Sequence, residues 1–374
     1  MKVAIIVDWL SVIGGAERVL AEMTALYPSA HLFAVVDHLQ DRAILNGCPV
    51  TTSFVQGLPG AGRHYRRYLP LMPLAVEQWN LGGYDLVLSA SHAVAKGVIS
   101  TPWQVHIAYI HTPMRFAWDL QDESLEQAAL SRPGGWIARW LLHRLRLWDQ
   151  ISAQRPDHLI ANSAFVADRI RKYWRREAEV IHPPVTCGRF EPRANTDDFY
   201  LSVSRLVPGK QIELLVRAFA AMPDRRLVVI GDGPELKRLR RMASPNVGIM
   251  GWQPDEVVAD HMARCRAFVL AATEDFGIAP LEAQAAGRPV VALGRGGALE
   301  SMNGLDHSRP NAVFFAEPTV ASLRDGLDRF EANAARFSPH ECRANAERFA
   351  PQRFRDALAQ AVNKAMAARE RRSP

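Results

Sequence analysis

The sequence predicts an α/β protein built from two doubly wound, Rossmann-like domains. Short apolar runs alternate with amphipathic stretches over most of the 374 residues, a pattern typical of β-α units and parallel sheets. A polar stretch rich in proline divides these runs into two series. The length also suits two domains of roughly 150 residues each.

In the first half, apolar runs predict strands at residues 3–7, 32–36, 86–88 and 159–161. We place the domain boundary in the proline-rich stretch at 183–196. In the second half, apolar runs predict strands at 199–203, 227–230, 247–250, 268–271 and 290–293. Residues 351–370 predict a last helix, because Pro351 suits the first helical position. The predicted domains are residues 1–185 and 196–350, followed by a helical segment at 351–374.

The composition and net charge restrict which classes of protein the sequence can belong to. Hydrophobic residues make up 48% and charged residues 22%, so the chain can bury a large core. No run approaches the ~18 uncharged apolar residues of a membrane span, and residues 1–30 lack a signal-peptide pattern. The four cysteines lie far apart, which argues against a zinc site or a disulfide framework and favours a reducing cytoplasm. The net charge of +6 favours anionic partners, and nucleic acid, anionic lipid and phosphorylated substrates all fit.

Ligands of open α/β sheets bind beyond the carboxyl ends of the strands, so two such domains facing each other predict a site in the cleft between them. Gly14 and Gly15 follow the first strand and would let a ligand approach a helix N-terminus. They lack the full dinucleotide fingerprint and could form a plain turn. His111 follows another strand-like run, although a single histidine is more often structural.

The second domain carries two loops suited to a nucleotide. Arg205 and Lys210 follow the strand at 199–203 and precede an apolar helix that starts near Ile212, a placement that suits a diphosphate. A Walker A loop is excluded, and two solvated surface cations remain the alternative. The Gly231-Asp232-Gly233 turn follows the next strand and would permit close approach of a nucleotide. A plain turn in which Asp232 caps the helix is equally consistent.

The strongest signal lies at residues 273–283, where a strand ends at Ala271 and a helix begins near residue 278. Glu274 falls in the loop and Glu282 in the helix. A glutamate among Ala and Gly neighbours is unusual in a core and favours a ligand role. The backbone N–H groups of a helix start favour an anion, and we expect this role for Phe276, Gly277 and Ile278.

Two basic aromatic segments suggest an interface. Residues 63–68 contain Arg63, Arg66 and Arg67 beside tyrosines. On a helix over residues 136–148, Arg139, His143 and Arg146 share one face beside Trp136, Trp140 and Leu147. This pattern is typical of helices at membrane surfaces, although a solvated surface helix would show it too.

Taken together, these motifs resemble the nucleotide-sugar glycosyltransferases of family 4 over nearly the whole chain. The resemblance rests on the two glutamates eight positions apart with Phe-Gly between them, on Ser-Arg-Leu and Gly-Lys earlier in the same domain, and on His111 and the glycine pair. It implies the GT-B architecture: two facing Rossmann-like domains, with a C-terminal helix that crosses back to the first. The first domain would bind the acceptor and the second the nucleotide sugar.

The resemblance also implies roles for single residues. Arg205 and Lys210 would hold the donor diphosphate with the amides near Phe276 and Gly277, and Gly15 would lie at the phosphate end. Glu282 would bind the ribose and Glu274 the donor sugar, whose far side would meet His111. Electrostatic stabilisation of this kind makes a metal or other cofactor unnecessary, and no Asp-x-Asp occurs in the chain. Family members retain the anomeric configuration, so we expect front-face attack with the leaving phosphate as base.

Residues 109–119 are similar to bacterial enzymes of O-antigen and exopolysaccharide assembly, many of which use GDP-mannose. This similarity predicts a mannosyltransferase with a lipid-linked saccharide acceptor. The basic segments then favour a peripheral enzyme on the inner face of the cytoplasmic membrane, and no nucleic-acid partner is expected, because no such motif appears. The sequence departs from the family pattern at residues 305–310, where a Gly-rich turn is common. A UDP-sugar-dependent transferase, a sugar-nucleotide epimerase and a non-catalytic nucleotide-sugar-binding protein are the alternatives.

Overall fold

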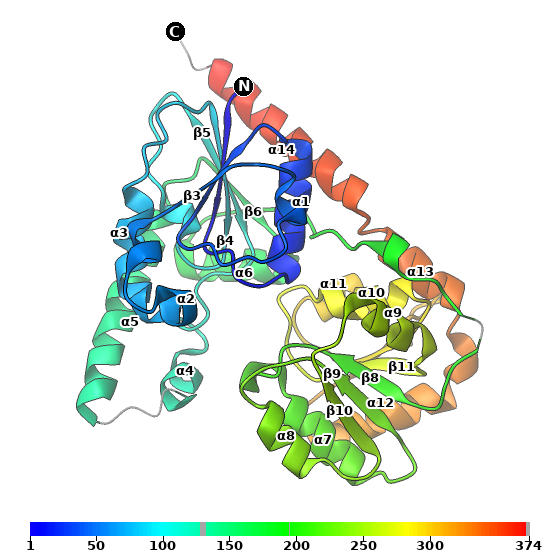
Figure 1. Cartoon of the computed structure of the whole chain (residues 1–374). Coiled ribbons are helices and arrows are strands. Elements are labelled where there is room, and N and C mark those ends of the chain that lie inside the picture. Colours follow the sequence, from blue (N-terminus) through cyan, green and yellow to red (C-terminus); the bar gives the residue numbers. More distant parts are fainter. Residues whose placement is uncertain (128–131, 194, 372–374) are drawn as a thin grey trace. The chain divides into compact units, whose positions relative to one another are not determined.

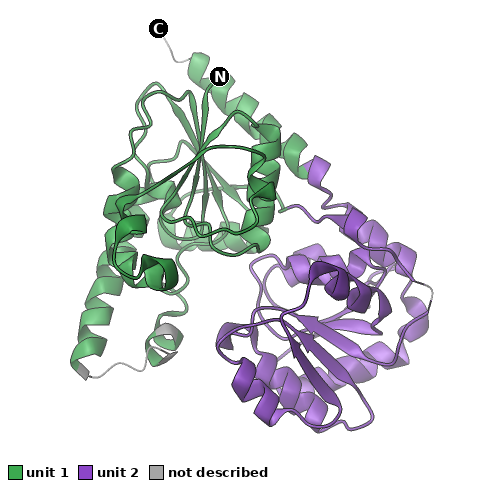
Figure 2. Ribbon diagram, viewed as in Figure 1, with its two compact units in different colours: residues 1–183, 354–374 green, residues 184–353 purple. Residues whose placement is uncertain are grey.

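The computed structural model describes residues 1–127, 132–193 and 195–371, and the chain divides into two compact units (Figure 2). Unit 1 comprises Met1–Pro183 and Phe354–Pro374, and unit 2 comprises Pro184–Arg353. Ala194, in the predicted boundary stretch, and the last three residues of the predicted C-terminal segment lie outside the described residues.

Unit 1 contains a sheet of seven parallel strands in the order β3-β2-β1-β4-β5-β6-β7. The central strands are buried along their whole length, as expected for a parallel sheet covered on both faces. The strands are β1 (Val3–Val7), β2 (His31–Ala34), β3 (Val50–Thr52), β4 (Leu86–Ser91), β5 (Val105–Ile110), β6 (His158–Ala161) and β7 (Glu179–Val180).

Helices cover this sheet, and one of them is the last helix of the chain. They are α1 (Gly15–Leu26), α2 (Ala61–His64), α3 (Met72–Glu77), α4 (Gln121–Gln127), α5 (Arg132–Ser152), α6 (Ala164–Trp174) and α14 (Pro351–Glu370). The C-terminal helix α14 lies beside α1 (Figure 1) and buries Phe354, Leu358 and Val362 in a core shared with β1 and α1. An Arg355–Glu22 ion pair also joins α14 to α1. The prediction that the last helix returns to the first domain is confirmed.

Unit 2 contains six parallel strands in the order β10-β9-β8-β11-β12-β13. They are β8 (Tyr200–Val203), β9 (Leu227–Ile230), β10 (Val247–Gly251), β11 (Ala267–Leu270), β12 (Val290–Leu293) and β13 (Ala312–Phe315). The helices around them are α7 (Ile212–Ala220), α8 (Leu236–Met242), α9 (Asp255–Arg264), α10 (Ile278–Ala285), α11 (Ala298–Ser301), α12 (Val320–Ala332) and α13 (Pro339–Glu347).

Both sheets reverse their strand order beside their first strand. In unit 1, β2 and β3 lie on one side of β1, and β4 to β7 lie on the other. In unit 2, β9 and β10 lie on one side of β8, and β11 to β13 lie on the other. Ligands of such sheets bind at the carboxyl ends of the two strands that flank the reversal, which are β1 and β4 in unit 1, and β8 and β11 in unit 2.

The structure extends the predicted strand list and moves one boundary. The two edge strands of unit 1, β3 and β7, and the last strand β13 were not predicted. The boundary stretch also differs, because Val185, Cys187 and Phe190 are buried in the core of unit 2. Residues 184–193 therefore pack as part of unit 2, although their prolines and polar residues suggest a linker. All four cysteines are free and buried.

Candidate active site

The predicted Lys210 and Glu274 meet at the strand-order reversal of unit 2. Lys210 ends the short 3-10 helix η6 (Pro208–Lys210) that follows β8, and Glu274 follows β11. The Lys210 Nζ lies 2.7 Å from both Glu274 carboxylate oxygens. The two side chains are 23% and 19% exposed, so solvent or a ligand can reach both. An ammonium ion in this position can exchange its carboxylate partner for an incoming phosphate.

Two glycines after β12 hold the Glu274 loop in place. The Gly297 N–H donates to the Glu274 carbonyl at 2.9 Å. Gly296 has a φ of +69°, and a Cβ at this residue would lie 2.4 Å from the Glu274 carbonyl oxygen. A Cβ on Gly297 would lie 2.4 Å from the Cα of Phe276, closer than van der Waals contact allows. The sequence reasoning missed this support, although a glycine pair just after the predicted strand at 290–293 signals it.

The Gly231-Asp232-Gly233 turn supports the Arg205 loop. Gly231 has a φ of +145°, and a Cβ there would lie 1.8 Å from the Ser204 carbonyl oxygen. The glycines are therefore required because two segments of the protein approach each other closely at this turn. Asp232 is exposed and accepts a hydrogen bond from the Gly233 N–H at 2.7 Å. Because α8 begins only at Leu236, the alternative in which Asp232 caps the helix is wrong. Arg205 itself is exposed.

Helix α10 places Glu282 on its buried side, where the residue is 7% exposed. Arg189, in η5 (Cys187–Arg189), lies with Nη1 3.7 Å from Glu282 Oε1 and Nη2 2.5 Å from Asp255 Oδ2. The guanidinium offsets part of the cost of burying the Glu282 charge. The sequence reasoning missed Arg189, because it lies in the stretch that was assigned to the boundary.

The start of α10 carries the predicted backbone donors. Gly277 occupies the N-cap with a φ of +95°, and Ile278 is the first helical residue. The first N–H groups of a helix have no partner inside the helix and favour an anion. The Phe276 side chain is buried and packs edge-on against Phe349, with the ring centroids 5.2 Å apart. Phe276 therefore anchors the loop with its ring and can offer only its backbone to a ligand.

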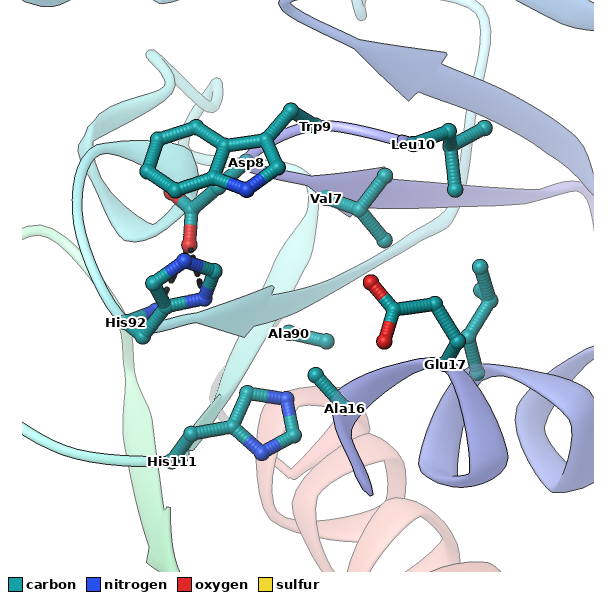
Figure 3. Close-up of a pocket in the computed structure, with 10 residues that line it drawn as sticks. Val7, Asp8, Trp9, Leu10, Ala16, Glu17, Ala90, His92 and His111 are labelled. Atoms are coloured by element: carbon teal, nitrogen blue, oxygen red, sulfur yellow. Dashed lines mark hydrogen bonds and ion pairs between the residues drawn. The ribbon is translucent and has the colours of Figure 1, made fainter. Parts of the chain in front are cut away.

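In unit 1, Gly14 and Gly15 are exposed at the start of α1. The Gly14 N–H donates to Glu17 Oε2 at 2.9 Å, so Glu17 closes the loop between β1 and α1. Glu17 also lines a small pocket with Asp8, His92 and His111 (Figure 3). Among these lining residues, the sequence reasoning singled out only His111.

His111 directly follows β5 and is held neutral. Burial lowers its pKa to about 3 from an ordinary value of 6.5. Its Nε2 is buried and has no hydrogen-bond partner among the described residues. A neutral imidazole with an open nitrogen is suited to a hydrogen bond with a hydroxyl group of a substrate.

The two basic aromatic segments differ in how far they are exposed. Arg63, Arg66 and Arg67 are all exposed, on α2 and on η3 (Tyr65–Leu71). On α5, Trp136 and Trp140 are 78% and 61% exposed, and Arg139 lies 3.6 Å from Asp122. Arg146 instead donates to the Ala117 carbonyl at 2.9 Å and to Gln121. The prediction that Arg146 belongs to the outer basic face is therefore wrong.

The described residues form neither a metal-binding cluster nor a membrane-spanning helix. No group of three or more His, Cys, Asp and Glu side chains is arranged to hold a metal ion. Over the same residues, no helix has both the length and the apolar character to cross a membrane.

Comparison with protein families gives two matches that meet at residue 189, a few residues after the start of unit 2 at Pro184. A family model described as Glycosyltransferase Family 4 matches residues 13–189. A second model, described as Glycosyl transferases group 1, matches residues 189–349. Together they run from the glycine loop that follows β1 to just past the end of α13.

Comparisons with single proteins agree with these matches. The chain is 31% identical to a GDP-mannose-dependent alpha-(1-6)-phosphatidylinositol monomannoside mannosyltransferase of Mycolicibacterium smegmatis, over 38% of this chain and 48% of the relative. It is also 31% identical to the lipopolysaccharide core biosynthesis glycosyltransferase LpsE of Rhizobium meliloti, over 37% of this chain and 44% of the relative. The chain thus spans about half the length of these curated relatives. Among solved structures, Anabaena HepE in complex with UDP and glucose matches 97% of this chain and 99% of its own, with a TM-score of 0.68 and 18% identity.

Proposed function

Because the chain belongs to glycosyltransferase family 4 and has the GT-B fold, we propose that it transfers mannose from GDP-mannose to a lipid-linked saccharide during assembly of a cell-surface polysaccharide. The observation that carries this proposal is the Lys210–Glu274 pair, which lies at the strand-order reversal of unit 2. The mannose donor is supported by the mycobacterial relative, which is named as GDP-mannose-dependent. The polysaccharide role is supported by LpsE, which is named for lipopolysaccharide core biosynthesis.

Donor binding would rearrange the Lys210–Glu274 pair. The donor diphosphate competes with the Glu274 carboxylate for Lys210, and the exposed Arg205 guanidinium adds a second cation. Glu274, once released from Lys210, can accept hydrogen bonds from hydroxyl groups of the sugar. The buried Glu282 carboxylate binds the ribose hydroxyls, which are hydrogen-bond donors. In unit 1, Gly15 is accessible at the start of α1, and the neutral His111 can bind a sugar hydroxyl.

The same groups would stabilise the leaving group during transfer. The bond between the anomeric carbon and the diphosphate oxygen breaks, and the diphosphate leaves with the electron pair. Lys210, Arg205 and the first amides of α10 oppose the negative charge that develops there. The acceptor oxygen bonds to the anomeric carbon on the same face, and its proton moves to the leaving phosphate, so the configuration is retained. With these cations and amides opposing the charge, the proposed step needs no metal ion.

The test of this reaction is GDP release in the presence of a chelator. The protein is given GDP-mannose, with or without a lipid-linked saccharide extract, and the product is analysed by NMR for its anomeric configuration. Acceptor-dependent GDP release and an α-linked mannose support the proposal. Transfer only from UDP-sugars would replace the donor, an alternative favoured by the structural match to HepE bound to UDP and glucose. Conversion of the donor without acceptor would identify an epimerase, and binding without turnover would identify a non-catalytic nucleotide-sugar-binding protein.

We also propose a peripheral association with the inner face of the cytoplasmic membrane. Exposed Trp136, Trp140 and Ile137 on α5 could enter the headgroup region of a bilayer, and nearby cations would bind anionic lipid. The test is cosedimentation with anionic vesicles at low salt. Replacing both tryptophans by alanine should release the protein, as should neutralising Arg66, Arg67 and Arg139. Changing Arg146 is not part of this test, because Arg146 bonds inside unit 1. Full solubility of the wild type would contradict the proposal.

A further inference from the structure

A second constellation lies at the strand-order reversal of unit 1. Asp8 directly follows β1, and His92 directly follows β4, the two strands whose carboxyl ends flank the reversal. They line the small pocket that also includes His111, Glu17 and the half-buried Trp9 (Figure 3). By the general rule for open α/β sheets, this edge is where unit 1 binds a ligand.

Asp8 is held rigidly and fully buried. Its Oδ1 accepts the N–H groups of Val94 and Ala95 at 2.6 and 2.7 Å. Its Oδ2 accepts those of His92 and Ala93 at 2.6 and 3.0 Å. A carboxylate with four backbone donors cannot rotate without losing hydrogen bonds, so Asp8 fixes the start of the loop that carries His92.

The same carboxylate orients the His92 ring. Nδ1 of His92 lies 3.0 Å from Asp8 Oδ2. Because a carboxylate only accepts hydrogen bonds, the proton of a neutral His92 ring resides on Nδ1, and Nε2 is left with a lone pair. The His92 side chain is 31% exposed, which opens the ring to a ligand. The Trp9 ring packs edge-on against the imidazole with centroids 4.6 Å apart, and so limits its rotation.

The pocket beside this ring has the size and chemistry for a hydroxyl group. Its volume is about 10 Å³, the space of a single water-sized group. The His111 ring lies 6.3 Å from the His92 ring, and its buried Nε2 is without a partner among the described residues. The lone pair on Nε2 of His92 can therefore accept a hydrogen bond from one hydroxyl group in this pocket.

We propose, on the premise of the transferase activity proposed above, that His92 orients the nucleophilic hydroxyl of the saccharide acceptor. The hydroxyl donates its proton in a hydrogen bond to Nε2 of His92, which directs an oxygen lone pair toward the anomeric carbon. This hydrogen bond holds the hydroxyl group in the complex before transfer. It breaks as the anomeric bond breaks, when the hydroxyl proton moves from its contact with Nε2 to the leaving phosphate. No covalent bond to His92 forms. Asp8 is a positioning residue that acts through His92.

The test compares two replacements that each keep a different half of the imidazole. His92→Asn keeps an amide near the position of Nδ1, which can still contact Asp8, but leaves nothing at Nε2. His92→Gln places its amide near Nε2 and loses the Asp8 contact. Acceptor KM, donor KM, kcat and the melting temperature are measured for both. His340→Gln, at an exposed position in unit 2, is the control for loss of a histidine.

We expect His92→Asn to raise the acceptor KM or lower kcat about tenfold, the cost of one lost hydrogen bond, with an unchanged donor KM. His92→Gln should stay closer to the wild type despite a lower melting temperature. A purely structural role of His92 predicts the reverse order of the two variants. The reverse order, or equal losses in both, would overturn the inference. A wild type without acceptor-dependent turnover would instead refute the transferase activity itself, so the two failures are distinguishable.

Discussion

Lys210 has two competing partners in the proposed reaction, the Glu274 carboxylate and the donor diphosphate. In the structure the lysine is paired with the carboxylate at 2.7 Å, so both side chains are already at the edge of the sheet where the donor would bind. Because both are partly exposed, the pair contributes little to the stability of the fold. A role in ligand binding therefore explains the pair better than a role in folding.

Lys210→Ala should therefore lower kcat on the order of 10²-fold, because a cation that stabilises the leaving group is lost, with little change in melting temperature. Steady-state rates of GDP release measure this. Lys237→Ala, which removes an exposed lysine on α8, is the matched control. Activity of Lys210→Ala within about twofold of the wild type would contradict the assigned role.

His106, the second residue of β5, gives a prediction for stability rather than activity. It is fully buried and shares a hydrogen bond with the Ser89 hydroxyl at 2.9 Å. Burial, helped by the positive charges of Arg155 and Arg176, lowers its pKa to about 3 from an ordinary value of 6.5. The unfolded chain therefore binds a proton between these pH values that the folded chain does not.

The free energy of unfolding should fall as the pH drops below about 6.5. His106 alone should contribute about 2 kcal/mol to the loss between pH 7.5 and pH 5. Urea unfolding of His106→Gln at these two pH values should show a smaller difference than the wild type, whatever its absolute stability. The exposed His340→Gln controls for loss of a histidine. An unchanged difference in His106→Gln would show that this imidazole does not oppose protonation in the fold.

At the scale of elements, the sequence predicts the buried centre of each sheet better than its edges. The strands at 3–7, 227–230 and 290–293 were predicted with the observed bounds, because continuous apolar runs mark strands buried on both faces. Strand β3 was missed because Val50–Thr52 is short and only partly buried. Residues 184–193 were assigned to the boundary because they are rich in proline and polar residues. Val185, Cys187 and Phe190 within this stretch are nevertheless buried.

The sequence likewise predicts some features of the candidate site and misses others. Lys210, Glu274 and Glu282 each sit in a motif that can be read from neighbouring residues, so the sequence predicts them. The contact between Asp8 and the His92 loop spans 84 residues, and the contact that fixes Glu274 to Gly297 joins two different loops. Such contacts cannot be predicted from neighbouring residues in the sequence, because they form only when strands become neighbours in the sheet.

Gly231→Ala tests how one element positions another. The new Cβ would lie 1.8 Å from the Ser204 carbonyl oxygen, so the loop that carries Arg205 and Lys210 must move. We expect a lower melting temperature, by several degrees, and weaker donor binding in calorimetry. Gly188→Ala is the matched control, since a Cβ at that exposed glycine meets nothing within 4 Å. Donor affinity equal to that of the wild type in Gly231→Ala would show that the turn does not position the loop.

At the scale of the whole molecule, the chain ends in the unit where it began. Helix α14 buries Leu358 in the core of unit 1, whereas Lys210, Glu274 and Glu282, which are proposed to bind the donor, belong to unit 2. Leu358→Ala should therefore destabilise the protein by about 2–5 kcal/mol, seen as an earlier transition in urea, without weakening GDP binding at a low temperature where the protein is folded. Asn363→Ala, at an exposed position on the same helix, is the control. Equal stabilities of the two variants would show that α14 contributes nothing to the core of unit 1.

In the proposed reaction, unit 2 binds a nucleotide sugar, GDP-mannose, through Lys210 and Glu282 without a metal ion. The most direct measurement is the melting temperature of the wild type with a panel of GDP- and UDP-sugars in the presence of a chelator. A ligand at about 100 times its Kd adds roughly 2.7 kcal/mol to stability, a shift of several degrees. We predict such a shift with GDP-mannose, and its loss in Lys210→Ala and Glu282→Ala but not in Lys237→Ala. No shift with any nucleotide sugar, or a shift that both site variants retain, would contradict the account.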